Sequence, residues 1–327
     1  MKKSLLLLLA AAMLLSVTGC GGKNTQSTGQ TSKPNWPKKT VNFTVGYAAG
    51  GDSDMYARTI AKYMAKKTGG TFIVTNTTGA GGANALVSVS SAAPDGYTFL
   101  WNHDGCLVNE ALGNAPVSYL KDVDIGCGVL TDNSYTVVVN KTTGIHNYEE
   151  FIAYAKANPK KLTVNVNANS NGMDIIRKFE NAAGISLKYV EGSGSATERI
   201  ASCLGGHTDV VYANYSLLAD YVKNGDFYII GSLGAKPMDS HPEVPCLSNL
   251  TGHKIESPYI FGFRYPKGVN AKIITYFENI VQEITKDPEF IADINKLGGN
   301  VTFLPSAEHK KLQEAEIEAI RKRLGVK

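Results

Sequence analysis

Three stretches of small and polar residues are the best candidates for binding chemistry in this sequence. They are residues 46–54, 79–84 and 167–172, and each follows an expected strand and opens a segment with helical spacing. Small residues let the backbone come close to a ligand. The first N–H groups of a helix have no partners within it and the helix dipole is positive there, so an anion suits that position. The alternative is that residues 46–54 form an ordinary turn capped by Ser53 or Asp54.

Two enzymatic alternatives use the same kind of stretch. Residues 79–84 read Gly-Ala-Gly-Gly-Ala-Asn, as in a dinucleotide-binding turn. However, Asn84 stands at the third small position, and no acidic residue for a ribose is evident at the end of a second strand. A hydrolase would place Ser193 in a G-x-S-x-G turn, but Glu191 stands two positions before it. We therefore expect no enzyme, no cofactor and no metal.

His103 is the histidine of greatest interest, because it lies at the carboxyl end of an expected strand. The six histidines are scattered, without an H-x-x-x-H pair that would bind a metal. If His103 lines a cleft, its imidazole can hydrogen-bond a carboxylate. Affinity would then rise as the pH falls toward the pKa of His103.

Expected strands and helices alternate from Thr40 onward, which predicts an α/β fold with largely parallel sheets. Ala57, Ile60, Ala61 and Met64 repeat at helical spacing after the first turn, and the C-terminal part is expected to be helical. Strands are expected at 43–45, 71–75, 97–101, 123–130, 135–140, 162–166, 187–190, 209–212, 227–233 and 259–265. Five polar stretches fall at the carboxyl ends of such strands, where open α/β sheets bind ligands.

The N-terminus indicates export. Two lysines precede an apolar run, and the sequence Val-Thr-Gly then leads to Cys20, as in a lipoprotein signal. We expect a signal peptide at 1–19, lipid on Cys20 and a flexible tether at 20–36 that includes Trp36. The alternative is a plain secretory signal with an incidental cysteine. The expected location is the outer face of the cell membrane or its periplasmic side.

Charge and cysteine content exclude some classes of protein. The formal net charge is +4, or about +2 without the two lysines of the signal, so the basic stripe of a nucleic-acid binder is missing. Four further cysteines lie far apart with no C-x-x-C pair, and they are either disulfides or buried thiols. They are Cys106, Cys127, Cys203 and Cys246.

Several motifs, in this order and spacing, resemble one family. They are GYAAGGDSD at 46–54, NTTGAGG at 76–82 and APDGYT at 93–98, with weaker matches at 204–209 and 242–245. In combination they are similar to the extracytoplasmic solute-binding receptors of tripartite tricarboxylate transporters, also called Bug or TctC-like proteins. The resemblance covers the chain from about Pro37 to its end.

The resemblance implies a two-domain, class II periplasmic-binding-protein fold that closes on its ligand by hinge motion. Domain 1 would be residues 37–133 plus 257–327, and domain 2 residues 134–256. The ligand would be a small carboxylate, such as a mono- or dicarboxylate or an amino acid, held without metal or cofactor. The partners would be the membrane subunits of a transporter, to which a monomeric receptor delivers the ligand. A receptor that signals its ligand state to a sensor protein is the alternative.

The resemblance also implies which residues contact the ligand. Domain 1 would supply main-chain groups and side chains from Ala48, Ala49, Gly50, Gly51, Ser53, Asp54, Ala80, Gly81, Gly82, His103 and Asp104. Domain 2 would supply Asn169, Ser170, Asn171, Gly172, Asp174, Ser193 and Asn214.

Three acidic residues depart from the family pattern. Asp52 replaces a usual glycine, and Asp104 and Asp174 stand where small or hydroxyl residues are usual. Carboxylates near an anion site would repel a dianion or trianion. One hypothesis is therefore a ligand that is a zwitterion, such as an amino acid, or a monocarboxylate with a neutral or cationic tail. The alternative is that these carboxylates point to solvent or cap helices.

Overall fold

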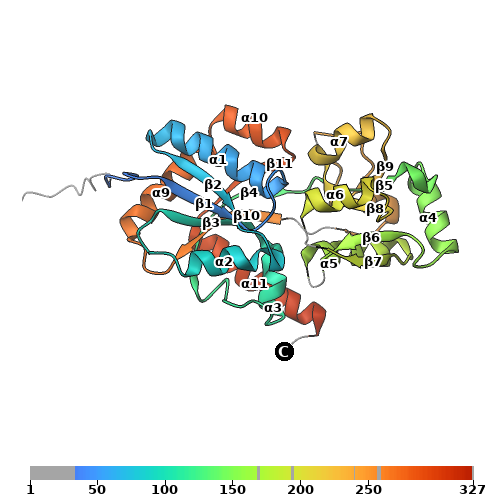
Figure 1. Ribbon diagram of the computed structural model, residues 1–327, viewed down its shortest axis with the longest axis horizontal. Coiled ribbons are helices and arrows are strands. Elements are labelled where there is room, and N and C mark those ends of the chain that lie inside the picture. Colours follow the sequence, from blue (N-terminus) through green and yellow to red (C-terminus); the bar gives the residue numbers. More distant parts are fainter. Residues whose placement is uncertain (1–33, 168–169, 193–194, 239, 256–258, 326–327) are drawn as a thin grey trace, which may run out of the picture. The chain divides into compact units, whose positions relative to one another are not determined.

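The computed structural model describes residues 34–327, apart from positions 168–169, 193–194, 239, 256–258 and 326–327. Two β-sheets with helices packed against them form this part of the chain (Figure 1). The strands are β1 (Val41–Val45), β2 (Phe72–Asn76), β3 (Thr98–His103), β4 (Val123–Asp132), β5 (Tyr135–Asn140), β6 (Thr163–Val166), β7 (Lys188–Glu191), β8 (Val210–Asn214), β9 (Phe227–Ser232), β10 (Tyr259–Pro266) and β11 (Gly299–Leu304).

The helices accompany one sheet or the other. With the first sheet lie α1 (Asp52–Thr68), α2 (Ala83–Ser90), α3 (Leu107–Ala111), α9 (Ala271–Ile284), α10 (Pro288–Lys296) and α11 (Ser306–Leu324). With the second lie α4 (Tyr148–Ala157), α5 (Asn171–Ala183), α6 (Ala196–Leu204), α7 (Tyr215–Lys223) and α8 (Leu247–Thr251). Short 3-10 helices are η1 (Ala80–Gly82), η2 (Asp104–Cys106) and η3 (Lys141–Thr143).

Both sheets are mixed. The first has the order β11-β4-β10-β3-β1-β2 and the second β7-β6-β8-β5-β9. In the first, β1 runs parallel to β2 and β3, whereas β10 runs antiparallel to β3 and β4. In the second, β6 is parallel to β7 and β8, whereas β5 is antiparallel to β8 and β9. The expectation of largely parallel sheets was therefore wrong, since β10 and β11 in the first sheet and β5 in the second run against the strands that they pair with.

Alternating side chains of the central strands fill a core on both faces of each sheet. In β3, Phe99 and Trp101 belong to the core on the side of α1, α9 and α10, and Leu100 belongs to the core on the side of α2, α3 and α11. In β5, Val137 and Val138 divide in the same way between α4 with α5 and α6 with α7. This two-sided burial explains why these strands read as nearly continuous apolar runs.

Trp36 corrects the expected extent of the tether. Its side chain is 6% exposed, and its ring lies 6.0 Å from Phe72 and 6.1 Å from Phe277, centre to centre. The indole Nε1 donates a hydrogen bond of 2.9 Å to the carbonyl of Gly96. Trp36 is therefore part of the core of the first sheet and not of a tether.

The C-terminal part contains one strand that the sequence analysis did not anticipate. Residues after α10 form β11, which pairs antiparallel with β4 at the edge of the first sheet. The expected helices on either side of it, α9 and α11, are present. This strand has six residues, which is too short for its spacing to stand out between two long helical patterns.

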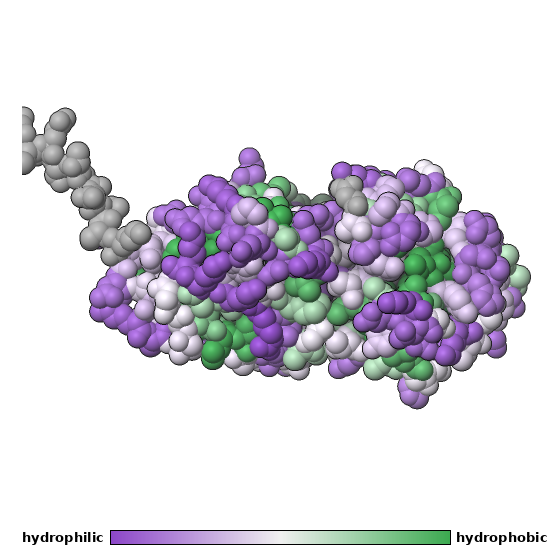
Figure 2. Space-filling model, turned by 90° about the horizontal axis from the view of Figure 1, so that it is seen from above, coloured by the Kyte–Doolittle hydropathy of each residue, from purple (hydrophilic) through white to green (hydrophobic). Residues whose placement is uncertain are grey.

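The face over α1 and α10 is largely hydrophilic (Figure 2). There Lys62 pairs with Asp293 at 3.0 Å and Lys66 with Glu289 at 2.9 Å. Throughout the described part of the chain, no helix is both long enough and apolar enough for a membrane span. The four cysteines after Cys20 are buried free thiols, which settles the choice left open by the sequence.

Candidate ligand-binding site

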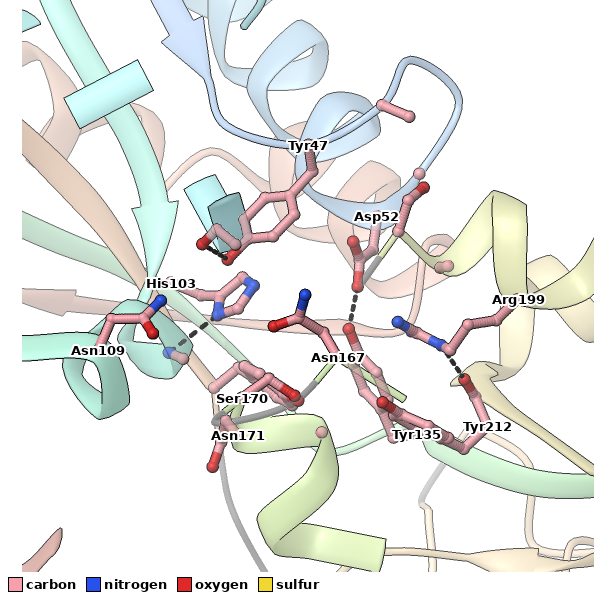
Figure 3. A pocket seen from close by; sticks show the side chains of 18 residues that line it. Tyr47, Asp52, His103, Asn109, Tyr135, Asn167, Ser170, Asn171, Arg199 and Tyr212 are labelled. Atoms are coloured by element: carbon pink, nitrogen blue, oxygen red, sulfur yellow. Dashed lines mark hydrogen bonds between the residues drawn. The ribbon is translucent and has the colours of Figure 1, made fainter. Parts of the chain in front are cut away.

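A pocket is lined by residues from elements of both sheets (Figure 3). Most of its wall is built by turns that follow strands and by the first residues of helices, as open α/β sheets predict. It is lined by Tyr47, Ala48, Gly51, Asp52, Gly81, His103, Gly105, Asn109, Tyr135, Asn167, Ser170, Asn171, Gly172, Ser195, Ala196, Arg199, Tyr212 and Tyr259.

The turn between β1 and α1 is held close to η1 by glycine. A Cβ atom on Gly46 would lie 2.7 Å from the Cα atom of Gly82, so a larger residue would push the two turns apart. Asp54 fastens the same turn, because its carboxylate accepts bonds from the Gly50 amide at 2.9 Å and from the Asn76 amide group at 3.0 Å. Arg58 adds a third bond at 2.9 Å. Asp54 therefore stabilises the turn and does not line the pocket.

The first turn is not capped by Ser53 or Asp54, which was the alternative that the sequence left open. Helix α1 begins at Asp52 with Gly51 as its N-cap, and no side chain caps it. Ser53 and Asp54 both lie inside the helix and are buried. The turn is therefore closed by glycine and by the contacts of Asp54.

Asp52 is a buried carboxylate in the pocket wall, with an exposed fraction of 6%. Its Oδ1 accepts a bond of 2.6 Å from the Ser53 amide. Its Oδ2 accepts a bond from the hydroxyl of Tyr135, which belongs to the second sheet. Of the three acidic residues that depart from the family pattern, Asp52 is the one that lines the pocket.

His103 is stacked between aromatic rings. Its ring lies 4.8 Å from that of Tyr47 at an angle of 12° and 4.6 Å from that of Tyr259 at 89°. Nδ1 accepts a bond of 2.9 Å from the Gly105 amide, so in the neutral ring the proton lies on Nε2, a donor. Burial lowers the pKa of His103 to about 4, although the charges of Asp52 and Asp104 oppose the shift. The ring is therefore neutral at pH 7.

Arg199 is the cationic side chain among the described residues that line the pocket. Its exposed fraction is 4%, and its guanidinium lies 4.3 Å from the ring centre of Tyr212. Its Nε donates a bond of 3.0 Å to the carbonyl of Tyr212. In Figure 3 the guanidinium points into the pocket, toward the side where Asp52 and Tyr135 meet.

The start of α5 forms the opposite wall. Ser170 caps this helix by accepting a bond of 3.1 Å from the Met173 amide. A Cβ atom on Gly172 would lie 2.1 Å from the hydroxyl oxygen of Tyr212, so only glycine lets the helix start come so close to that ring. The main chain at this end of α5 is thus presented to the pocket.

The structure brings together part of the predicted site. Predicted residues that line the pocket are Ala48, Gly51, Gly81, His103, Ser170, Asn171 and Gly172. Predicted residues outside its lining are Ala49, Gly50, Ser53, Asp54, Ala80, Gly82, Asp104, Asp174 and Asn214. Asn169, Ser193 and Cys20 lie outside the described residues.

Three of these residues have other partners. Asp104 accepts a bond of 2.8 Å from Gln313 on α11, and Asp174 pairs with Lys178 at 3.1 Å. Asn214 is fully buried and donates to Asp132 at 2.7 Å, at the point where the chain passes between the sheets. Their polar groups are thus directed at other parts of the protein.

Two important wall residues were missed by the sequence analysis, Arg199 and Tyr135. Arg199 lies within the first turn of α6, where the helix dipole disfavours a cation. This unfavourable position, one turn after a glycine- and serine-rich stretch, could have marked Arg199 as a candidate site residue in the sequence. Tyr135 gave none, because a tyrosine at the start of a strand is common in packing.

Comparisons with known proteins find relatives over most of the chain. The model of the tripartite tricarboxylate transporter receptor family matches residues 56–324. A Cupriavidus necator protein described as a UPF0065 protein is 27% identical over 309 residues, with 91% of each chain covered.

Two solved structures share the fold. The periplasmic binding protein BugD has a TM-score of 0.79 at 23% identity, with 89% of this chain and 99% of that chain covered. An R. palustris protein described with adipate has a TM-score of 0.82 at 21% identity and the same coverage. The expected α/β, periplasmic-binding-protein fold is confirmed.

Proposed function

The chain belongs to the tripartite tricarboxylate transporter receptor family, and on that premise we propose that it captures a small carboxylate-bearing metabolite in the pocket between its sheets. The ligand would be a mono- or dicarboxylate or an amino acid. Proteins of this family are solute-binding receptors and not enzymes, so the oxidoreductase and hydrolase alternatives are set aside.

The observation that supports a carboxylate most directly is the set of donors in the wall. Arg199 presents a buried guanidinium, and His103 presents Nε2–H from a neutral ring. The starts of α1 and α5 add main-chain groups at the positive ends of helix dipoles. The adipate in the R. palustris structure is a small carboxylate too.

The domain bounds are part of the proposal. Domain 1 would be residues 37–133 plus 257–327, and domain 2 residues 134–256. The grouping of strands supports this, because β1 to β4, β10 and β11 form one sheet and β5 to β9 the other. The pocket takes residues from both sheets, which supports capture by closure around a hinge near Asp132.

We also propose that the receptor works outside the cytoplasm, anchored by lipid on Cys20. The apolar run before that cysteine supports this, and so does the polar stretch after it. The buried Trp36 shortens the tether, which would end before this residue. Replacing Cys20 by alanine should move the protein from the membrane fraction to the soluble fraction of cells.

Delivery to the membrane subunits of a tripartite tricarboxylate transporter completes the proposal. A ligand-sensing receptor for a signalling partner is the alternative. Deleting the gene would separate the two. Loss of uptake of the bound solute supports transport, whereas intact uptake with a lost transcriptional response supports sensing.

The test of binding is a thermal-shift screen with a library of carboxylates and amino acids. A ligand at 100 times its Kd should add about 2.7 kcal/mol to the free energy of unfolding. A stabilising carboxylate supports the proposed function. A library without a single stabilising member would contradict it.

A further inference from the structure

The charges in the pocket are balanced. Among the described residues of its lining, one side chain is anionic, Asp52, and one is cationic, Arg199. His103 adds no charge at pH 7. Both charged side chains are more than nine-tenths buried. A dicarboxylate would bring two negative charges into a site whose own formal charge is zero and which already contains a carboxylate.

The Asp52 carboxylate has acceptor capacity beyond its internal bonds. An ionised carboxylate has about four acceptor positions on its two oxygens. Oδ1 accepts bonds from the Ser53 amide and, at 3.3 Å, from the Ser53 hydroxyl, and Oδ2 accepts a bond from the Tyr135 hydroxyl. The remaining position, on Oδ2, suits a ligand with an N–H donor and positive charge. A carboxylate of the ligand would be repelled there.

The Arg199 guanidinium is the matching position for the ligand's own carboxylate. Arginine has five N–H donors in a planar fork that fits a carboxylate in a bidentate manner. Stacking on Tyr212 and the bond from Nε hold the fork in place. Figure 3 shows the guanidinium and the Asp52 carboxylate pointing toward the same part of the pocket.

From this pair we infer that the ligand is a zwitterion of the amino-acid type, with its ammonium group on Asp52 and its carboxylate on Arg199. The inference rests on the proposed function and narrows it. The hypothesis drawn from the sequence rested on three acidic residues, whereas this inference rests on one acidic residue and one arginine. Asp104 and Asp174 are directed elsewhere, and a cation that the sequence analysis missed supplies the second charge. Asp52 is thus the residue that selects for the ammonium group.

The test compares pairs of ligands that differ by the amine alone. The pairs are L-alanine with propionate, L-aspartate with succinate and L-glutamate with glutarate, titrated into the wild-type protein by calorimetry. We expect at least one amino acid to bind roughly 30-fold or more tightly than its partner, as is usual when a buried charge loses its counter-charge. Partners that bind equally well would overturn the inference while leaving the proposed function intact. If no member of either series binds, the inference is overturned as well, and the thermal-shift screen with the wider library decides on the proposed function.

The variant Asp52→Asn assigns the preference to one residue. It keeps the shape of the side chain and removes its charge, so the preference for the amine should fall at least about tenfold. Asp293→Asn is the matched control, because Asp293 pairs with Lys62 on α1 at 3.0 Å and is not part of the pocket lining. A preference that survives intact in Asp52→Asn would contradict the role of Asp52. The wild-type comparison does not depend on whether the variant folds.

Discussion

The hydroxyl of Tyr135 donates a hydrogen bond to the carboxylate of Asp52. Tyr135 begins the first strand of the second sheet, and Asp52 begins α1 on the first sheet. The bond therefore links the two sheets across the pocket wall. The family pattern predicts glycine at position 52, so the buried carboxylate is a departure of this chain from that pattern.

Removing this hydroxyl should lower stability. In Tyr135→Phe the ring can keep its stack on Tyr259, whose centre is 4.8 Å away, but Asp52 loses a donor. A buried polar group left without a partner costs about 1–3 kcal/mol. Urea unfolding should show that loss in Tyr135→Phe and a smaller change in Tyr276→Phe on α9. Equal stability of the two variants would show that the bond does not contribute.

Asp132 should make stability depend on pH. It accepts bonds from Tyr56 at 2.9 Å, from Asn214 at 2.7 Å and from the Ser134 amide at 2.8 Å. Burial, followed by the charge of Asp52, nevertheless raises the pKa of Asp132 from 3.8 to about 6. The folded protein therefore binds this proton more tightly than the unfolded chain does.

The sign follows from that difference in proton binding. The stabilising contribution of Asp132 is fully present below about pH 3.8 and is lost as the pH rises through about 6. The shift corresponds to about 3 kcal/mol. Between pH 4 and pH 7, the free energy of unfolding of the wild type should therefore fall relative to Asp132→Asn by most of that amount. Parallel pH profiles of the two proteins would refute this prediction.

Binding should not depend on protonation of His103 between pH 8 and pH 5.5. The sequence suggested that affinity would rise as the pH falls, but burial lowers the pKa of His103 to about 4, so the ring stays neutral over this range. The ratio of the affinities of wild type and His103→Gln for the best ligand of the calorimetric panel should therefore be constant. A ratio that grows about tenfold toward pH 5.5 would indicate a protonated ring.

Trp36 should contribute strongly to folding, although the sequence placed it in a tether. Its side chain is 6% exposed and packs among aromatic residues of the first sheet. Replacing a buried tryptophan by alanine costs about 3–5 kcal/mol. Trp36→Ala should show a loss of that size in urea unfolding. Lys38→Ala, at an exposed position two residues later, is the control and should remain close to wild type.

Much of the fold could be predicted from local patterns. The strand at Tyr135–Asn140 has the bounds that the sequence suggested, and the helical spacing of Ala57, Ile60, Ala61 and Met64 lies within α1. Their apolar spacing and flanking breakers act within a few residues. Pairing direction could not be predicted in this way, because it depends on where the chain leaves one sheet and enters the other.

The parts of the pocket wall that are formed by main-chain turns could be predicted from the sequence. The turns that contain Gly51, Gly81 and Gly172 follow from small residues at strand ends, and all three glycines line the pocket. Side-chain direction was not predictable. Asp52 and Asp54 are two residues apart, yet one lines the pocket and the other fastens the turn behind it. Arg199 lies far from both in sequence, and only the packing of the second sheet brings it to them.

The most direct test of the central claim is a calorimetric titration of the wild type and Arg199→Gln with the six amino acids and carboxylates named above. We expect at least one of them to bind the wild type at a single site. The same ligand should bind Arg199→Gln roughly 30-fold or more weakly, because its carboxylate loses the guanidinium. Failure of all six to bind the wild type, or equal affinity for both proteins, would contradict a carboxylate position at Arg199.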